Sequence, residues 1–168
     1  RKIALSLYLD KKEKLSFVVI GYDNIDFSDI EDMANINRIK TEKNGCFDYN
    51  HFEDVVSKDN IDFIVFSCVN KPLGVMQDID DVTSLASKKD IPIAVDVTDV
   101  IGIANIKFSE LKADYWVFSL ASSNPTMEFS YLFAKNNQKL SSKAFGESYI
   151  NQKFQKENIL SKYFLNIA

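Results

Sequence analysis

Residues 62–68 read DFIVFSC, a continuous apolar run that predicts a buried strand. Similar apolar runs lie on both sides of this stretch, at residues 15–20 (LSFVVI), 91–95 (IPIAV), 115–119 and, more weakly, 36–41. Runs without polar alternation are typical of strands covered on both faces, as in parallel sheets. We therefore expect a strand at each of these places.

Segments with helical periodicity lie between these runs. We predict helices over residues 27–34, 49–58 and 78–89, the second capped by Asp48 and the third closed by basic residues at its end. This alternation predicts an α/β fold of three layers, α/β/α, around a mostly parallel sheet. Residues 127–134 follow the fifth run after a short loop, which favours one antiparallel strand near the C-terminus.

Length and composition indicate one globular domain, since the chain has 168 residues and 46% of them are apolar. We expect residues 1–140 to form the α/β core and residues 141–168 to form a C-terminal loop and helix. The charges total 20 Lys and Arg against 24 Asp and Glu, without a basic stripe. This pattern argues against nucleic-acid binding.

Cys46 and Cys68 lie far apart, with no CxxC motif or histidine cluster, so we expect neither a disulfide framework, nor a metal site, nor a secreted protein. A cytoplasmic location is the default. Residues 1–9 superficially resemble a signal peptide, but an amphipathic helix suits the short run better. No apolar run approaches the roughly 20 residues of a membrane span, so no membrane association is expected.

Two segments carry a family resemblance. Residues 69–79, VNKPLGVMQDI, resemble the V-N-N-E-x-G-V-x-Q-D-I stretch of cysteine desulfurases, which are class V aminotransferase-type, fold-type I pyridoxal-phosphate (PLP) enzymes. Without a gap the register continues to residues 94–102, similar to H-V-D-A-x-Q-x-x-G, and to residues 117–122, opposite S-F-S-G-H-K. The resemblance implies that residues 1–140 are the incomplete core of the large domain of a PLP-dependent transferase.

The same register implies that most functional positions have changed. Asp96 matches the aspartate that holds the pyridine nitrogen, and Ser119 matches a serine that contacts the cofactor phosphate, so these two residues are the vestigial cofactor-binding candidates. Ser122 stands where the Schiff-base lysine would be, and a Schiff base requires a primary amine. The other departures are Asp99 for glutamine, Lys71 for asparagine, Ala121 for the histidine before the lysine and, across a gap, Asn24 for the ring-stacking histidine.

These residues also have ordinary structural interpretations, which we favour. Asp96 is better explained as a buried carboxylate bonded to nearby hydroxyls or backbone amides, and Ser119 as a hydroxyl that satisfies a loop. Lys71 is a conceivable substitute amine, but a solvated or ion-paired lysine is the simpler interpretation. His51 is expected at the surface near a helix start, and the acidic run at residues 23–32 lacks the glycine and glutamate of a calcium loop.

The sequence thus predicts a pseudoenzyme: a degenerate cysteine desulfurase-like domain with no catalytic residues and no expected cofactor, acting in dimerisation or partner binding. Because enzymes of the family dimerise, the resemblance implies a homodimer or a heterodimer with a related chain. The alternative is one part of a PLP-dependent cysteine desulfurase or aminotransferase whose lysine comes from another segment or chain. A third possibility is a cleft that binds another small molecule through Asp96 and Ser119.

Overall fold

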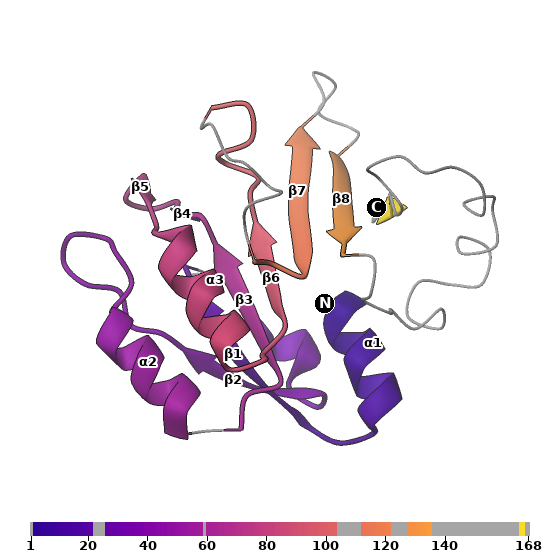
Figure 1. The fold of residues 1–168 in the computed structure, drawn as a ribbon. Helices are drawn as coiled ribbons and strands as arrows, with labels where there is room; N and C mark the ends of the chain where they lie inside the picture. The colour runs from indigo at the N-terminus through magenta and orange to yellow at the C-terminus, as the bar shows by residue number, and fades with distance from the viewer. Residues whose placement is uncertain are drawn as a thin grey trace.

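The computed structural model describes residues 2–21, 26–58, 60–103, 112–121, 128–135 and 165–166. A seven-stranded sheet in the order β2-β1-β3-β6-β7-β8-β9 runs through the molecule (Figure 1). Its strands are β1 (Leu15–Ile20), β2 (Ala34–Arg38), β3 (Phe63–Ser67), β6 (Ile93–Asp96), β7 (Tyr115–Ala121), β8 (Glu128–Ala134) and β9 (Leu165–Asn166). The helices are α1 (Lys2–Lys11), α2 (Tyr49–Lys58), α3 (Ile79–Lys88) and the 3-10 turn η1 (Ser28–Ile30).

The strand directions confirm the predicted sheet. β2, β1, β3, β6 and β7 pair in parallel, and β8 pairs antiparallel with β7, as its short connection indicates. β9 adds a second antiparallel strand that the sequence did not predict. A separate antiparallel pair, β4 (Val69–Asn70) and β5 (Val75–Met76), forms a small hairpin beside the main sheet.

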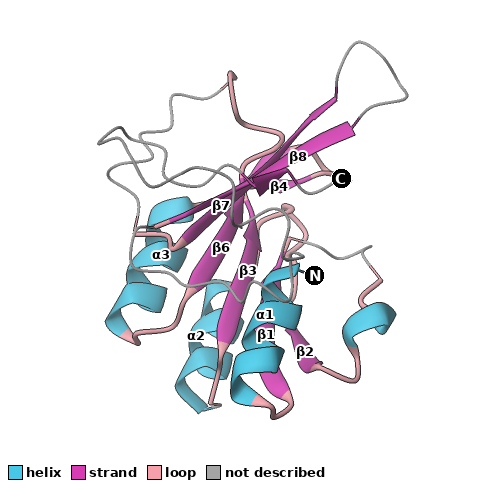
Figure 2. Cartoon of the chain, turned by 90° about the vertical axis from the view of Figure 1, so that its right-hand side faces the viewer, coloured by secondary structure: helices cyan, strands magenta, loops and turns pink. Residues whose placement is uncertain are grey.

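Helices cover both faces of the sheet, which gives the predicted three layers (Figures 1 and 2). On one face, α2 and α3 bury Phe52 and Val82 in a cluster with Ile64 of β3. On the other face, α1 and η1 bury Ala4 and Ile30 in a second cluster that contains Phe63, also of β3. Neighbouring residues of β3 thus enter opposite clusters, because strand side chains alternate between the faces. This arrangement explains why the strand reads as a continuous apolar run.

Both long helices on the first face begin at aspartate caps. The backbone N–H of His51 donates to Asp48 Oδ1 at 2.9 Å at the start of α2, which confirms the predicted cap. At the start of α3, Asp78 Oδ1 accepts from the amides of Asp80 and Asp81 at 3.0 and 3.3 Å. Such caps satisfy amide donors that the first helical turn leaves without partners.

The segment before β2 corrects one prediction. Residues 27–34 were expected to be helical, but the structure has only η1 and a turn, and β2 begins at Ala34. Ala34 pairs with Leu15, so the strand also starts before the predicted range of 36–41. Two asparagines and an arginine within β2 hide the apolar pattern, which is compatible with a strand at the edge of the sheet.

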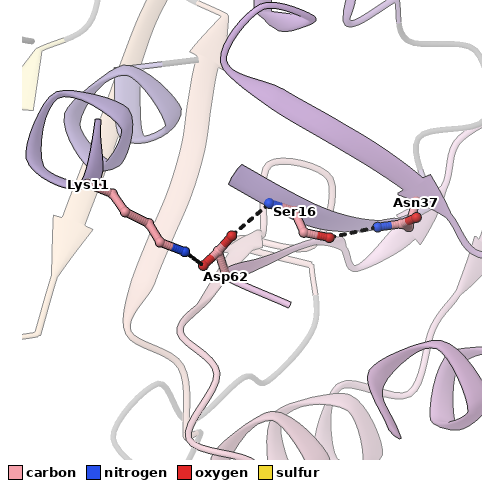
Figure 3. Close-up of polar contacts among 4 residues, drawn as sticks. All are labelled: Lys11, Ser16, Asn37 and Asp62. Carbon is pink, nitrogen blue, oxygen red and sulfur yellow. Dashed lines mark hydrogen bonds and ion pairs between the residues drawn. The ribbon is translucent and has the colours of Figure 1, made fainter. Parts of the chain in front are cut away.

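At the end of the sheet where the parallel strands begin, one carboxylate joins a helix to the strands (Figure 3). Asp62 Oδ1 accepts from Lys11 Nζ at 2.6 Å, and Asp62 Oδ2 accepts from the Ser16 amide at 2.7 Å. Asn37 Nδ2 in turn donates to Ser16 Oγ at 3.1 Å. These contacts connect the end of α1 with β1, β2 and the start of β3.

The predicted C-terminal loop and helix fall mainly outside the described residues. Where that region is described, Leu165–Asn166 form a strand, so a helix does not extend over these two residues. The N-terminal helix predicted for residues 1–9 corresponds to α1. None of the helices in the described ranges has the length and apolar character required to cross a bilayer.

Candidate functional site

The two candidate residues of the sequence analysis lie on neighbouring strands. Asp96 is the last residue of β6, and Ser119 lies near the end of β7, to which β6 is paired in parallel. Both residues therefore stand toward the edge formed by the carboxyl ends of the parallel strands, which we call the carboxyl edge. In open α/β sheets this edge is where ligands generally bind.

Thr98 connects the two residues. Its backbone N–H donates to Asp96 Oδ1 at 2.9 Å, and its hydroxyl oxygen accepts from the Ser119 amide at 3.0 Å. The first contact is an Asx turn, in which an aspartate side chain binds the amide two residues ahead. Asp96 and Ser119 are thus brought together, and one Asp96 oxygen and the Ser119 amide are engaged by the fold itself.

Cys68 follows β3 at the same edge. Its side chain is buried, with 1% of the residue exposed, and its amide donates to the Asp96 carbonyl at 3.1 Å. Burial raises the pKa of the Cys68 thiol to about 12, with smaller contributions from the carboxylates of Asp96 and Asp99. A thiol is a nucleophile only when ionised, so this cysteine is unreactive near neutral pH.

An ion pair spans two loops of the carboxyl edge. Lys71 Nζ, in the loop between β4 and β5, lies 3.1 Å from Asp99 Oδ2, in the turn after β6. The side chains are 61% and 35% exposed, so solvent reaches both groups. Both positions depart from the resembled pattern, and the structure places the two new charges against each other.

Buried amides fix the neighbouring turn at residues 41–47. The Gly45 carbonyl accepts from Asn70 Nδ2 at 3.1 Å and from Gln77 Nε2 at 3.0 Å. Gln77 Oε1 also accepts from the Phe47 amide at 2.8 Å. Asn70 and Gln77, both from the segment that carries the resemblance, therefore have structural roles in joining this turn to the β4–β5 hairpin.

Several residues of the sequence analysis are not placed. Ser122 and Asn24 lie outside the described residues, and Ala121 is described only as the last backbone position of β7. Within the described ranges, no group of histidine, cysteine, aspartate and glutamate side chains is arranged to hold a metal ion.

Sequence reasoning missed Thr98, the residue at the centre of the Asp96 and Ser119 contacts. The available signal was the spacing Asp96-Val97-Thr98 directly after a buried strand, which is typical of an Asx turn. The contact with Ser119 had no local signal, because it depends on the register between β6 and β7.

Comparison with known families agrees with the fold and the sequence motifs. A family model described as aminotransferase class V matches residues 24–121. The chain belongs to this family. No curated protein sequence matches it.

Solved structures share the fold of the PLP-dependent transferases. A cysteine desulfurase from Thermococcus onnurineus NA1 has a TM-score of 0.61 at 19% identity, covering 70% of this chain and 30% of its own. A NifS-like protein from Rickettsia africae ESF-5 has a TM-score of 0.55 at 18% identity, covering 68% and 33%. A chain of the SepCysS–SepCysE N-terminal domain complex has a TM-score of 0.66 at 18% identity, covering 86% and 42%. At these identities the likeness establishes the fold, and the chain spans less than half the length of each.

Proposed function

We propose that this chain is a non-catalytic, cysteine desulfurase-like domain that acts in dimerisation or partner binding. The observation that carries the proposal is the ion pair between Lys71 and Asp99. A single drifted position at a catalytic edge would leave an unmatched charge. Here the two changed positions carry opposite charges that face each other, as expected of an edge that no longer holds the cofactor.

Pyridoxal phosphate is the cofactor that the family implies, and the described residues do not fit it. The amine of Lys71 is paired with Asp99 rather than available to an aldehyde. The Ser119 amide, a potential phosphate donor, is engaged by Thr98. Asp99 adds a second carboxylate beside Asp96, where the resembled pattern has an uncharged glutamine, and this addition raises the free energy of an anionic group bound there. We therefore expect no bound cofactor.

Partner binding is supported by the assemblies of this fold. One structural neighbour is described as a complex of SepCysS with the N-terminal domain of SepCysE. A homodimer, or a heterodimer with a related class V chain, is the assembly we propose.

The catalytic half of the proposal is tested by mixing the purified protein with pyridoxal phosphate. We expect no stable aldimine absorbance, and borohydride reduction should fix no cofactor onto a single lysine, as mapped by peptide mass spectrometry. An active PLP-dependent desulfurase treated in parallel serves as the positive control. A stable absorbance band with one stoichiometrically labelled lysine would refute the proposal.

The binding half is tested by sedimentation velocity over a wide range of protein concentration. A reversible dimer, or a stable complex with a copurifying class V chain, is the expected result. A protein that remains monomeric and recovers no related chain from its native source would contradict this half.

A second candidate function takes its support from the length of the matched structures. The chain covers between 30% and 42% of the length of each of the three structures above. In this alternative, another segment or a related chain supplies the lysine of a PLP-dependent cysteine desulfurase or aminotransferase. Desulfurase activity that appears only in a mixture of the two chains would favour it. Inactivity of that mixture, with both partners shown to associate, would exclude it.

A further inference from the structure

The large apolar side chains that stand mostly in solvent, among the residues that the structure describes, all lie at the carboxyl edge. They are Leu73, which is 57% exposed, Met76, which is 55% exposed, and Ile103, which is 85% exposed. Leu73 and Met76 belong to the β4–β5 hairpin, and Ile103 ends the turn that follows β6. Exposed apolar residues scattered singly are normal, whereas a group of them at one edge indicates a binding surface.

The ion pair between Lys71 and Asp99 holds these two loops beside each other. Its 3.1 Å contact joins the loop of the hairpin to the turn after β6. Both loops project from the upper end of the sheet in Figure 1. The pair therefore marks the boundary between them, with exposed apolar residues on each side.

The hairpin presents Met76 on the face that points away from Gly45. Val69 and Met76 are cross-strand partners, so their side chains share one face, while Asn70 and Val75 share the other. Asn70 Nδ2 donates to the Gly45 carbonyl, which fixes the second face against that turn. Because the hairpin is already held in place, little conformational freedom is lost when a partner covers Met76.

We propose that a second copy of this chain binds at the edge patch, formed by Leu73, Met76, Ile103 and the ion pair. The inference rests on the proposed function and names the surface through which the homodimer forms. In a two-fold dimer the same surface is used twice, so residue i meets j and j meets i. A two-fold axis that passes between Lys71 and Asp99, at right angles to the line that joins them, places each Lys71 opposite Asp99 of the other copy.

The same axis brings the hairpin of one copy onto the turn of the other. Leu73 and Met76 then cover Ile103 of the other copy, so apolar groups meet apolar groups where opposite charges also meet. The chain carries a net charge of -4, which opposes self-association, but the two exposed charges of the ion pair sum to zero. A foreign partner needs a matching charge pair of its own, whereas a second copy supplies it by symmetry. A contact built on so few side chains is small, so we expect a reversible dimer.

Sedimentation velocity on substituted proteins tests the apolar part of the edge patch. Met76→Glu and Ile103→Glu should each weaken the dimer by about tenfold or more, because each buries an unpaired charge in the contact. Both side chains are exposed, so the fold should persist, as circular dichroism can verify. If the native protein and both variants dimerise equally, the edge patch is refuted while the proposed homodimer stands. A native protein that stays monomeric at every concentration overturns both.

Exchanged charges test the two-fold arrangement. Lys71→Glu and Asp99→Lys should each self-associate about tenfold more weakly or worse, because like charges then face each other. An equimolar mixture of the two variants should recover the dimer, since each supplies the sign that the other lacks, and recovery also shows that both are folded. Failure of the mixture to recover a dimer that the native protein forms would refute the arrangement.

The ion pair between Lys58 and Asp54 on α2 provides the matched control. It is also exposed, with a distance of 2.8 Å, and lies outside the edge patch. Lys58→Glu and Asp54→Lys change the net charge by the same amounts as the two test variants, so any effect of total charge alone appears here as well. We expect native dimerisation in both controls. Weakening equal to that of the test variants would assign the effect to net charge and overturn the proposal.

Discussion

Lys71 and Asp99 show how a changed site can remain stable. They belong to different loops of the carboxyl edge. The resembled family pattern has uncharged residues, asparagine and glutamine, at these two positions. Their approach to 3.1 Å links the β4–β5 hairpin to the turn that carries Thr98. Because both side chains are substantially exposed, solvent screens the pair and its energy is small.

A double-mutant cycle measures this link. Lys71→Met, Asp99→Asn and the double variant should give a coupling of about 0.2–1 kcal/mol in urea denaturation, the range of exposed ion pairs. The coupling should shrink in high salt, because salt screens exposed charges. Additive single effects in low salt would show that the two charges do not stabilise each other.

Cys68 and Cys46 differ in burial, so we expect their thiols to differ in reactivity. Burial raises the pKa of Cys68 to about 12, so almost no thiolate is present near neutral pH, whereas Cys46 is only half-buried. In the folded protein, we expect iodoacetamide to alkylate Cys46 and to leave Cys68 unmodified, and both should react in denaturant. Peptide mass spectrometry reads the two sites separately. Rapid modification of native Cys68 would mean that this edge opens to solvent.

Part of the candidate site could be predicted from the sequence. Asp96 and Ser119 were identified from their positions at the ends of apolar runs and from the family register. Thr98 could not be assigned its role, since its contact with Ser119 exists only once β6 and β7 are paired. The ion pair of Lys71 was one of several interpretations until the structure supplied Asp99 as its partner.

At the scale of elements, the turn at residues 41–47 and the β4–β5 hairpin pack closely through Gly45. This glycine has φ +88, and a Cβ there would lie 2.8 Å from Val75 Cγ2 and 3.0 Å from Leu73 Cδ1. Gly45→Ala should therefore lower the free energy of unfolding both through left-handed backbone strain of about 1 kcal/mol and through steric displacement of the hairpin. Chemical denaturation measures the loss.

Gly74 is the matched control for this substitution. It also has a left-handed backbone, with φ +65, but a Cβ there would meet no atom within 4 Å. Gly74→Ala should show the backbone strain alone and should be the milder of the two variants. Equal losses would show that the hairpin moves aside freely and that the close packing at Gly45 has little energetic weight.

Elements with strong local signals were predicted well from the sequence. The ranges of β1 and α2 agree with the structure, because an apolar run and a capped amphipathic pattern each define their own ends. The predicted helix at residues 27–34 was wrong, since pairing of Ala34 with Leu15 draws that residue into the sheet. The two-residue strands β4 and β5 are too short to produce a periodic pattern.

For the whole molecule, two buried acidic groups, the Cys68 thiol directly after β3 and the Tyr115 hydroxyl on β7, predict the response to alkali. The pKa of Tyr115 is raised to about 12 by burial, with a further contribution from Asp114, and that of Cys68 is raised to about 12 chiefly by burial. Their ordinary values are 10.0 and 9.0, so the unfolded chain releases these protons first as the pH rises. Stability from these groups is therefore complete below about pH 9 and is lost progressively between about pH 9 and pH 12.

Substitutions at the two positions should separate their contributions to this loss. Each group that is protonated in the folded state and ionised in the unfolded state steepens the fall by up to about 1.4 kcal/mol per pH unit. Cys68→Ala should lower stability at neutral pH through lost packing but flatten the curve above about pH 9, whereas Tyr115→Phe should flatten it only above about pH 10. Urea denaturation at a series of alkaline pH values measures both slopes. Curves parallel to that of the native protein would show that neither group ionises differently in the two states, and that alkali acts through other groups, such as the lysines.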